Sequence, residues 1–173
     1  MELYPTPIPM PHHFETSQWL PYPPELVFAF FANPENLPRL MPRWQRAHIE
    51  EAVFAPPPPH PPDSPRYPGI AAGDGTRLTL SLRPFPFAPF RIPWEAQIED
   101  FRWNQGFCDI QLRGPFTIWR HCHTVIPKDS GTTLHDTVTY DLPIAIRPIL
   151  TNIFRHRHQR TTELLALATG RTK

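Results

Sequence analysis

The alternation of apolar and polar positions is clearest in residues 107–143, which read as three consecutive strands. β-branched and aromatic residues fill the three runs, and breaks at Gly114-Pro115 and at 127–131 separate them. Runs of this composition, bounded by Gly, Pro, Asp and Ser, are typical of β-strands. The pattern therefore predicts a meander of strands at the centre of the fold.

Side chains alternate across a strand, so each residue of the meander can be assigned to one of two faces. In the last strand one face is polar throughout and must be the solvated one: Thr133, His135, Thr137, Thr139 and Asp141. The inner face then carries Leu134, Asp136, Val138, Tyr140 and Leu142. In the strand before it, one face holds Trp119, His121, His123 and Val125, and the other holds Arg120, Cys122 and Thr124.

The pairing of these two strands brings the inner polar residues together. A six-residue loop at 127–132 places His123 opposite Asp136 and Trp119 opposite Tyr140, and a two-residue shift would place His121 opposite Asp136 instead. In either register two imidazoles and a carboxylate lie within cross-strand reach on an inward face. Because buried polar groups without partners are costly, this face must form a closed network or line a cavity.

The remaining segments predict strands and helices around the meander. Strands are expected at 14–20, 44–54, 77–83 and 92–101, where Trp94, Ala96 and Ile98 share a side. A helix should begin in 21–25, with prolines and an acid in its first turn, and a second short helix should follow a cap at Asn33. The last helix should run from Arg147 to about Thr169, with Arg157 and Thr161 interrupting the apolar stripe Leu150, Ile153, Phe154, Leu164, Leu165 and Ala168.

Length and composition limit the function. The 173 residues suit one domain at 14–170, preceded by an extended proline-rich arm at 1–13. The net charge of +1 gives no reason to expect nucleic acid as a partner, and no apolar run is long enough to span a membrane. No secretory signal, nucleotide-binding glycine motif or CxxC pair is present, so we expect no cofactor, a cytoplasmic location and free thiols at Cys108 and Cys122. A register that brings these two cysteines opposite each other on the outer face is geometrically possible.

Residues 55–68, APPPPHPPDSPRYP, contain eight of the 26 prolines. Neither a strand nor a helix tolerates that density, so a polyproline II loop should protrude from the domain here. Such a loop is usually a passive surface insertion, but it is also the kind of segment that docks on aromatic-lined grooves of partner proteins.

Six stretches, in order and spread over nearly the whole chain, carry a family resemblance: PPELVFAFFANPENLPRLMP, GTRLTLSLR, PWEAQIED, FCDIQLRGPFTIWRHCH, GTTLHDTVTYDLP and IFRHR. Together they resemble the SRPBCC superfamily, the START-like helix-grip fold shared with the birch-pollen allergens. More narrowly they are similar to bacterial stand-alone members described as ligand-binding or cyclase/dehydrase-like. The resemblance implies an α+β fold, with a curved antiparallel sheet of about seven strands around a long C-terminal helix and two short helices after the first strand.

The resemblance further implies a cavity between sheet and last helix that binds a hydrophobic small molecule such as a lipid or polyketide. It places Asp109 and Gln111 inward beside His121, His123 and Asp136. The expected ligand-binding residues are Trp94, Asp109, Gln111, Trp119, His121, His123, Asp136, Tyr140, Phe154 and Arg157.

The polar set has three other interpretations. It can be a satisfied buried network that only sets strand register. It can be catalytic, with His121 or His123 as a general base oriented by Asp136 for a cyclisation or dehydration. It can hold a metal, since His-x-His puts two rings on one strand face beside Asp136 or Asp109. An interaction module that docks a partner through 55–68 is the remaining alternative for the whole chain.

Overall fold

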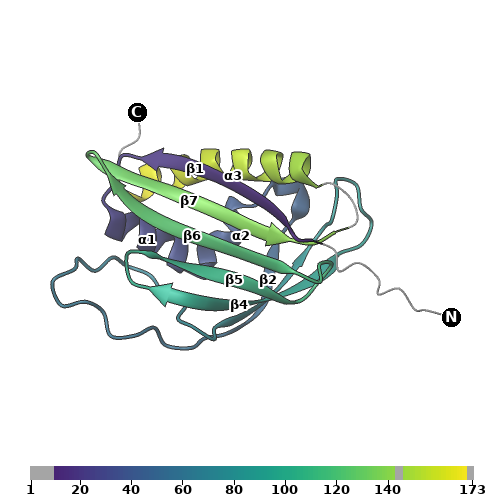
Figure 1. Ribbon diagram of the computed structural model, residues 1–173, viewed down its shortest axis with the longest axis horizontal. Coiled ribbons are helices and arrows are strands. Elements are labelled where there is room, and N and C mark those ends of the chain that lie inside the picture. Colours follow the sequence, from purple (N-terminus) through teal and green to yellow (C-terminus); the bar gives the residue numbers. More distant parts are fainter. Residues whose placement is uncertain (1–9, 143–145, 171–173) are drawn as a thin grey trace.

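A seven-stranded antiparallel sheet with α-helices on one side forms the fold in the computed structural model, which describes residues 10–142 and 146–170 (Figure 1). The spatial order is β1-β7-β6-β5-β4-β3-β2, so β2 to β7 form a meander that β1 closes at one edge. This architecture confirms the expected α+β helix-grip class. The strands are β1 His12–Leu20, β2 His48–Val53, β3 Arg77–Leu82, β4 Ile92–Arg102, β5 Gly106–Arg113, β6 Trp119–Lys128 and β7 Gly131–Tyr140.

Two short α-helices follow β1 and a long one closes the fold, as expected. They are α1 Pro24–Ala32, α2 Leu37–Leu40 and α3 Arg147–Ala168, with 3-10 turns at Pro34–Asn36 and Arg43–Gln45. The side chain of Asn33 accepts a hydrogen bond of 3.1 Å from the backbone N–H of Glu35, so it caps the 3-10 turn that leads into α2, while α2 itself has no side-chain cap. Among the described residues, no helix is both long and apolar enough to cross a membrane.

The pairing of β6 with β7 follows the first of the two expected registers, but the loop between these strands is shorter than expected. His123 lies opposite Asp136 and Trp119 opposite Tyr140, whereas His121 faces Val138, so the alternative register is wrong. The expected six-residue loop is also wrong, because Lys128 still pairs with Gly131 and only Asp129 and Ser130 connect the strands. Asp129 takes the left-handed conformation, with φ of 54°, that so tight a connection needs.

Two other boundaries differ from expectation. Strand β1 begins at His12, because His12 and His13 pair with β7 instead of belonging to an extended arm, while residues 1–9 of that arm lie outside the described residues. Strand β2 begins at His48, four residues late. Residues 43–45 form a 3-10 turn that Arg46 ends in the left-handed region, so this segment folds against the helices instead of extending the sheet.

The buried apolar side chains form two clusters, and α3 contributes to both. One cluster contains Leu164 and Leu165 with α1 and the ends of β4 to β7, and the other contains Leu150 and Phe154 with Phe14, Val138 and Tyr140. Arg157 and Thr161 are buried on the same stripe of α3. The polar residues of the helix therefore lie at the level where the two clusters separate.

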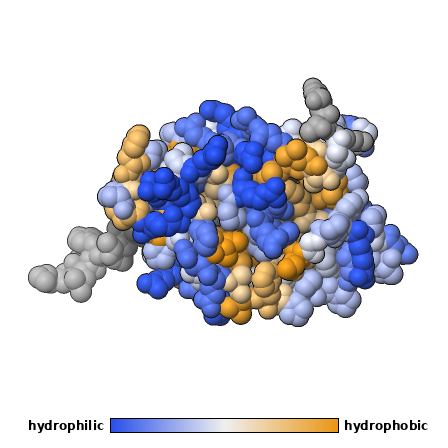
Figure 2. All heavy atoms as spheres, turned by 180° about the vertical axis from the view of Figure 1, so that it is seen from behind, coloured by the Kyte–Doolittle hydropathy of each residue, from blue (hydrophilic) through white to orange (hydrophobic). Residues whose placement is uncertain are grey.

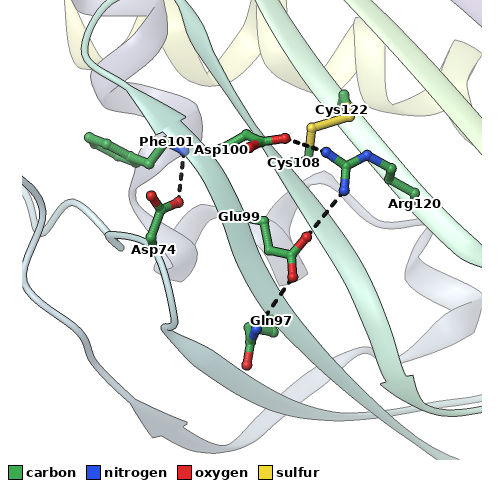
Figure 3. A network of polar contacts seen from close by, with 8 residues as sticks. All are labelled: Asp74, Gln97, Glu99, Asp100, Phe101, Cys108, Arg120 and Cys122. Carbon is green, nitrogen blue, oxygen red and sulfur yellow. Dashed lines mark hydrogen bonds and ion pairs between the residues drawn. A yellow bond between two sulfur atoms is a disulfide. The ribbon is translucent and has the colours of Figure 1, made fainter.

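The outer face of the sheet carries its own polar contacts (Figure 3). Arg120 pairs with Glu99 at 3.2 Å and with Asp100, across the irregular end of β4. Next to them Cys108 lies opposite Cys122, as was geometrically possible, and the two are joined in a disulfide. The expectation of free thiols is therefore wrong, because direct cross-strand pairing places the two sulfur atoms within bonding distance.

The proline-rich loop extends from the end of the molecule where β6 and β7 connect (Figure 1), but its base is attached to the fold. Trp103 Nε1 donates a hydrogen bond of 2.8 Å to the carbonyl oxygen of Pro58, and Asn104 Nδ2 donates one of 2.7 Å to Ser64 Oγ. The ring of His60 packs edge-on against Trp103, with centroids 4.7 Å apart. The segment at 55–68 is thus tied to the turn between β4 and β5.

Candidate functional site

A cavity of about 150 Å³ lies between the inner face of the sheet and the three α-helices. Strands β3 to β6 form its floor, and residues of α1, α2 and α3 cover it. Most of its wall is apolar, including Phe30, Phe31, Leu40, Leu80, Ala96, Ile98, Phe107 and Phe154. Seen from the helical side, the molecule is otherwise mostly polar, with separate apolar patches (Figure 2).

Seven of the ten expected ligand-binding residues line this cavity: Trp94, Asp109, Trp119, His121, His123, Phe154 and Arg157. The other three lie outside its wall. Asp136 sits behind the two histidines, Tyr140 belongs to the second apolar cluster, and Gln111 bonds the backbone of Phe116 in the loop after β5. The structure therefore brings the polar residues of three strands together, but only some of them reach the cavity.

His121 is the centre of the polar network. Its Nε2 lies 3.1 Å from Asp136 Oδ1 and its Nδ1 lies 3.1 Å from Asp109 Oδ2, so each ring nitrogen faces a carboxylate. Trp119 Nε1 donates a hydrogen bond of 3.3 Å to the other oxygen of Asp109. The alternation of strand residues explains this grouping, since Asp109 on β5 lies directly opposite His121 on β6.

His123 completes the network from the other side of Asp136. Its Nδ1 lies 2.6 Å from Asp136 Oδ1, but the contact is poorly aligned for a hydrogen bond. Phe31 and Phe107 pack on its ring, with centroid distances of 5.2 and 4.8 Å. The position of β5 against β6 depends on Gly106, where a Cβ atom would lie 2.1 Å from the carbonyl oxygen of His123.

The network assigns opposite charge states to the two histidines. Burial alone would lower the pKa of His121, but the charge of Asp109 and the hydrogen bonds that His121 donates to both carboxylates outweigh it and raise that pKa. Burial and the neighbouring charge of His121 lower the pKa of His123, and Asp136 does not compensate. His121 therefore favours the imidazolium form and His123 favours the neutral form.

Both carboxylates are ionised. Burial would raise the pKa of Asp136, but the close contacts of its carboxylate with the imidazoles of His123 and His121 outweigh burial and lower that pKa below its ordinary value. The pKa of Asp109 is lowered in the same way, chiefly by the charge of His121 acting against burial. Asp109 and Asp136 thus carry two negative charges, which His121 and Arg157 balance.

Arg157 reaches the cavity from α3. Its side chain is only 8% exposed, and its guanidinium carbon lies 5.3 Å from the centre of the Phe154 ring. Burial lowers its pKa, while the charges of Asp136 and Asp109 oppose that shift. No side-chain hydrogen bond or ion pair of Arg157 is present among the described residues.

Asp109, His121 and His123 offer ligand atoms within 4.8 Å of one another and could hold a metal ion. A metal there would need both histidines unprotonated, whereas the two carboxylates beside His121 raise its pKa and favour its protonated form. The positive charge of Arg157 beside the same group also opposes a divalent cation. The arrangement therefore fits an ion-pair network better than a metal centre.

Two groups of wall residues were missed in the sequence. Phe31 and Met41 come from the helical segment at 21–42, where no ligand-binding residue was expected. Gln45 is buried with its Oε1 unpaired, and it lay in a segment expected to be a strand. The signal that could have located Gln45 was the run of prolines at 34, 38 and 42, which favours short helical turns over an early strand.

Comparisons with known proteins identify the fold. No family model and no curated protein matches the chain. Among solved structures, protein CV1439 of Chromobacterium violaceum superposes with a TM-score of 0.67 at 13% identity, over 88% of this chain and 95% of that one. Ara h 8.0201 gives 0.60 at 13% identity, over 89% and 97% of the two chains.

A START superfamily protein from Mycobacterium smegmatis also superposes, with a TM-score of 0.59 at 13% identity, over 89% of this chain and 99% of that one. The agreement extends over nearly the full length of each neighbour, so it concerns the whole domain. The chain therefore has the helix-grip fold that START-like proteins share with the birch-pollen type of allergen.

Proposed function

We propose that this protein binds a compact apolar molecule in the cavity between its sheet and α3. The observation that carries the proposal is the cavity itself, which is walled by aromatic and aliphatic side chains and has a polar group at one side. A void of about this size lined by apolar groups holds a benzene-sized molecule. The cavity as it stands thus favours a small aromatic or alicyclic ligand over a long-chain lipid.

The catalytic alternative has less support from the geometry. A general base needs a free nitrogen within hydrogen-bond reach of the substrate. Both nitrogens of His121 already face carboxylates, and Nδ1 of His123 faces Asp136. Only one nitrogen of the pair remains for chemistry, so we favour binding over a cyclase or dehydratase reaction.

Filling the cavity tests the proposal. Ala96 is buried on β4 and lines the wall, so Ala96→Leu places three extra carbon atoms in the space of the ligand. Toluene binding, followed by calorimetry, should weaken by about tenfold or more, the factor that about 1.4 kcal/mol produces. Native mass spectrometry of the purified protein should show a matching loss of any co-purified molecule.

The matched control is Thr79→Leu. Thr79 lies on the neighbouring strand β3, opposite Glu95, and is absent from the cavity wall. It should leave toluene affinity unchanged. Equal toluene affinity in wild type and Ala96→Leu would overturn the proposal, and so would a wild-type protein that binds no toluene.

A further inference from the structure

We infer that the ligand is a small aromatic acid and that its carboxylate binds the guanidinium of Arg157. This inference rests on the proposed function, because it concerns the polar end of the molecule that occupies the cavity.

Arg157 is a buried cation without a directional partner. Its side chain is more than nine-tenths buried and lines the cavity, yet it makes no hydrogen bond or ion pair within the described ranges 10–142 and 146–170. A guanidinium carries five N–H donors. Among the described residues, none of the nitrogen atoms of Arg157 is both fully buried and unpaired, so its unpaired donors reach accessible space at the cavity. The other buried charges of the site, Asp109, His121 and Asp136, contact one another. Arg157 is the member of the group whose partner is missing.

Nearby carboxylates favour the charged form of Arg157, although its N–H groups donate no hydrogen bond to them. Asp136 and Asp109 act on it through space and counter the effect of burial, but neither approaches within ion-pair distance. The Phe154 ring packs against the guanidinium carbon and leaves the N–H groups at its edge free for an acceptor. The planar donor fork matches a carboxylate through two parallel hydrogen bonds.

The rest of the cavity suits an aromatic body. Phe31, Trp94, Phe107, Trp119 and Phe154 supply ring faces and edges around the space. Aromatic rings pack favourably edge-to-face or offset against one another. An aromatic ring that carries one carboxylate therefore matches the size of the cavity, its aromatic wall and the guanidinium of Arg157.

The charge balance determines how such an acid is bound. His121 and Arg157 already offset Asp109 and Asp136, so an added carboxylate leaves one excess negative charge in a water-poor site. The neutral His123 is the group that can take up a proton in response. Four charged groups surround it: His121 on β6, Asp136 on β7, Asp109 on β5 and Arg157 on α3, while α1 offers only Phe31. Acid binding should thus favour protonation of His123 and should weaken as the pH rises.

Calorimetry with benzoate, benzamide and toluene tests this assignment. Benzamide has the shape of benzoate without its charge, and toluene lacks a polar end. Wild type should bind benzoate at least about tenfold more tightly than benzamide. The affinity for benzoate should fall as the pH rises.

Two substitutions at Arg157 separate charge from geometry. Arg157→Gln should lower the ratio of benzoate to toluene affinity by about tenfold or more, and Arg157→Lys should lower it by less because it keeps the charge without the fork. The control is Arg155→Gln on the exposed side of α3, where Arg155 bonds only Asn152. It should leave all three affinities as in wild type.

The outcomes distinguish the inference from the proposed function. Tight toluene binding with benzoate no better than benzamide would overturn the acid assignment and leave the apolar cavity standing. An unchanged benzoate preference in Arg157→Gln would show that another group binds the carboxylate. A protein that binds none of the three probes contradicts the proposed function and this inference together.

Discussion

Asp136 connects the two histidines of the site. Its carboxylate is 2% exposed, and one oxygen lies within 3.1 Å of both His121 and His123. A buried ion pair adds little stability compared with an apolar replacement. Removal of one partner, however, leaves the other charge buried without compensation, which is strongly destabilising. This residue therefore matters more for the integrity of the site than for contact with a ligand.

Replacement of Asp136 by Asn should be strongly destabilising. The substitution keeps the shape and removes the charge that balances His121 and Arg157, so we expect the free energy of unfolding to fall by about 3–5 kcal/mol in urea denaturation. Asp63→Asn, at an exposed position of the proline-rich loop, should change it by less than about 0.5 kcal/mol. Equal effects of the two substitutions would mean that the buried network carries no such charge balance.

The two histidines should titrate in opposite directions from the ordinary imidazole pKa of about 6.5. NMR of the imidazole resonances, assigned with His121→Gln and His123→Gln, should give a raised pKa for His121 and a lowered one for His123. The raised pKa means that the stabilising contribution of His121 is complete below about pH 6.5 and is lost as the pH rises through the folded-state pKa.

The stabilising contribution of His123 depends on pH in the opposite direction. Its lowered pKa makes the neutral form the stable one, so its contribution is present above about pH 6.5 and is lost as the pH falls. Stability should therefore be highest between the two folded-state pKa values. Titration of His123 above His121 would contradict the assigned charge states.

At the scale of single elements, α3 packs against the sheet through one stripe of residues. Apolar positions stand at both ends of this stripe, and Arg157 and Thr161 lie between them. Its 3.6-residue period predicted which positions face the sheet, and the buried residues Leu150, Phe154, Arg157, Thr161, Leu164 and Leu165 confirm most of that set. Ala168 is exposed because the helix ends beside it. Of the two polar positions of the stripe, Arg157 lines the cavity, together with the apolar residues Leu150, Ile153 and Phe154.

Two leucines of α3 give a matched test of this packing. Leu165 is fully buried in the first apolar cluster, whereas Leu167 is 62% exposed. Leu165→Ala should cost about 2–5 kcal/mol of unfolding free energy, since it removes buried surface and leaves a void. Leu167→Ala, with the same intrinsic helix preference, should cost under about 0.5 kcal/mol. Similar losses for both would show that α3 does not pack through this face.

The segment between α2 and β2 differs most from the structure that its local sequence predicted. A strand over 44–54 was expected from its apolar and charged residues, but residues 43–45 turn against the cavity and bring Gln45 into its wall. Whether a short segment joins a sheet depends on the edge it can pair with. That edge, β3, lies about 30 residues further along the chain and accepts only Ile49 and its neighbours.

At the scale of the whole molecule, the proline-rich loop and the cavity lie apart. No residue of 55–68 belongs to the wall of the cavity; the loop instead packs on Trp103 and Asn104. Replacement of 55–68 by a glycine-serine linker should lower the free energy of unfolding by about 1–3 kcal/mol, because two hydrogen bonds are lost. Toluene affinity should stay within about twofold of wild type, and a larger loss would mean that the loop shapes the cavity.

The disulfide between Cys108 and Cys122 also bears on the whole protein. Such bonds persist in oxidising surroundings and are rare in the cytosol. The expected cytoplasmic location was based in part on the scarcity of cysteines. That support is lost, and the location stays a prediction.

The family resemblance supplied the fold class and the inward position of Asp109, and by itself the sequence determined the strand faces and limited the central register to two alternatives. It could do so because strand alternation and helical periodicity are local properties, and a polar run such as 133–141 identifies the solvated face. Only the tertiary structure decided which nitrogen meets which carboxylate, which histidine is charged, and that the donors of Arg157 are free. These depend on burial and on contacts between β5, β6, β7 and α3, distances that no local pattern of residues contains.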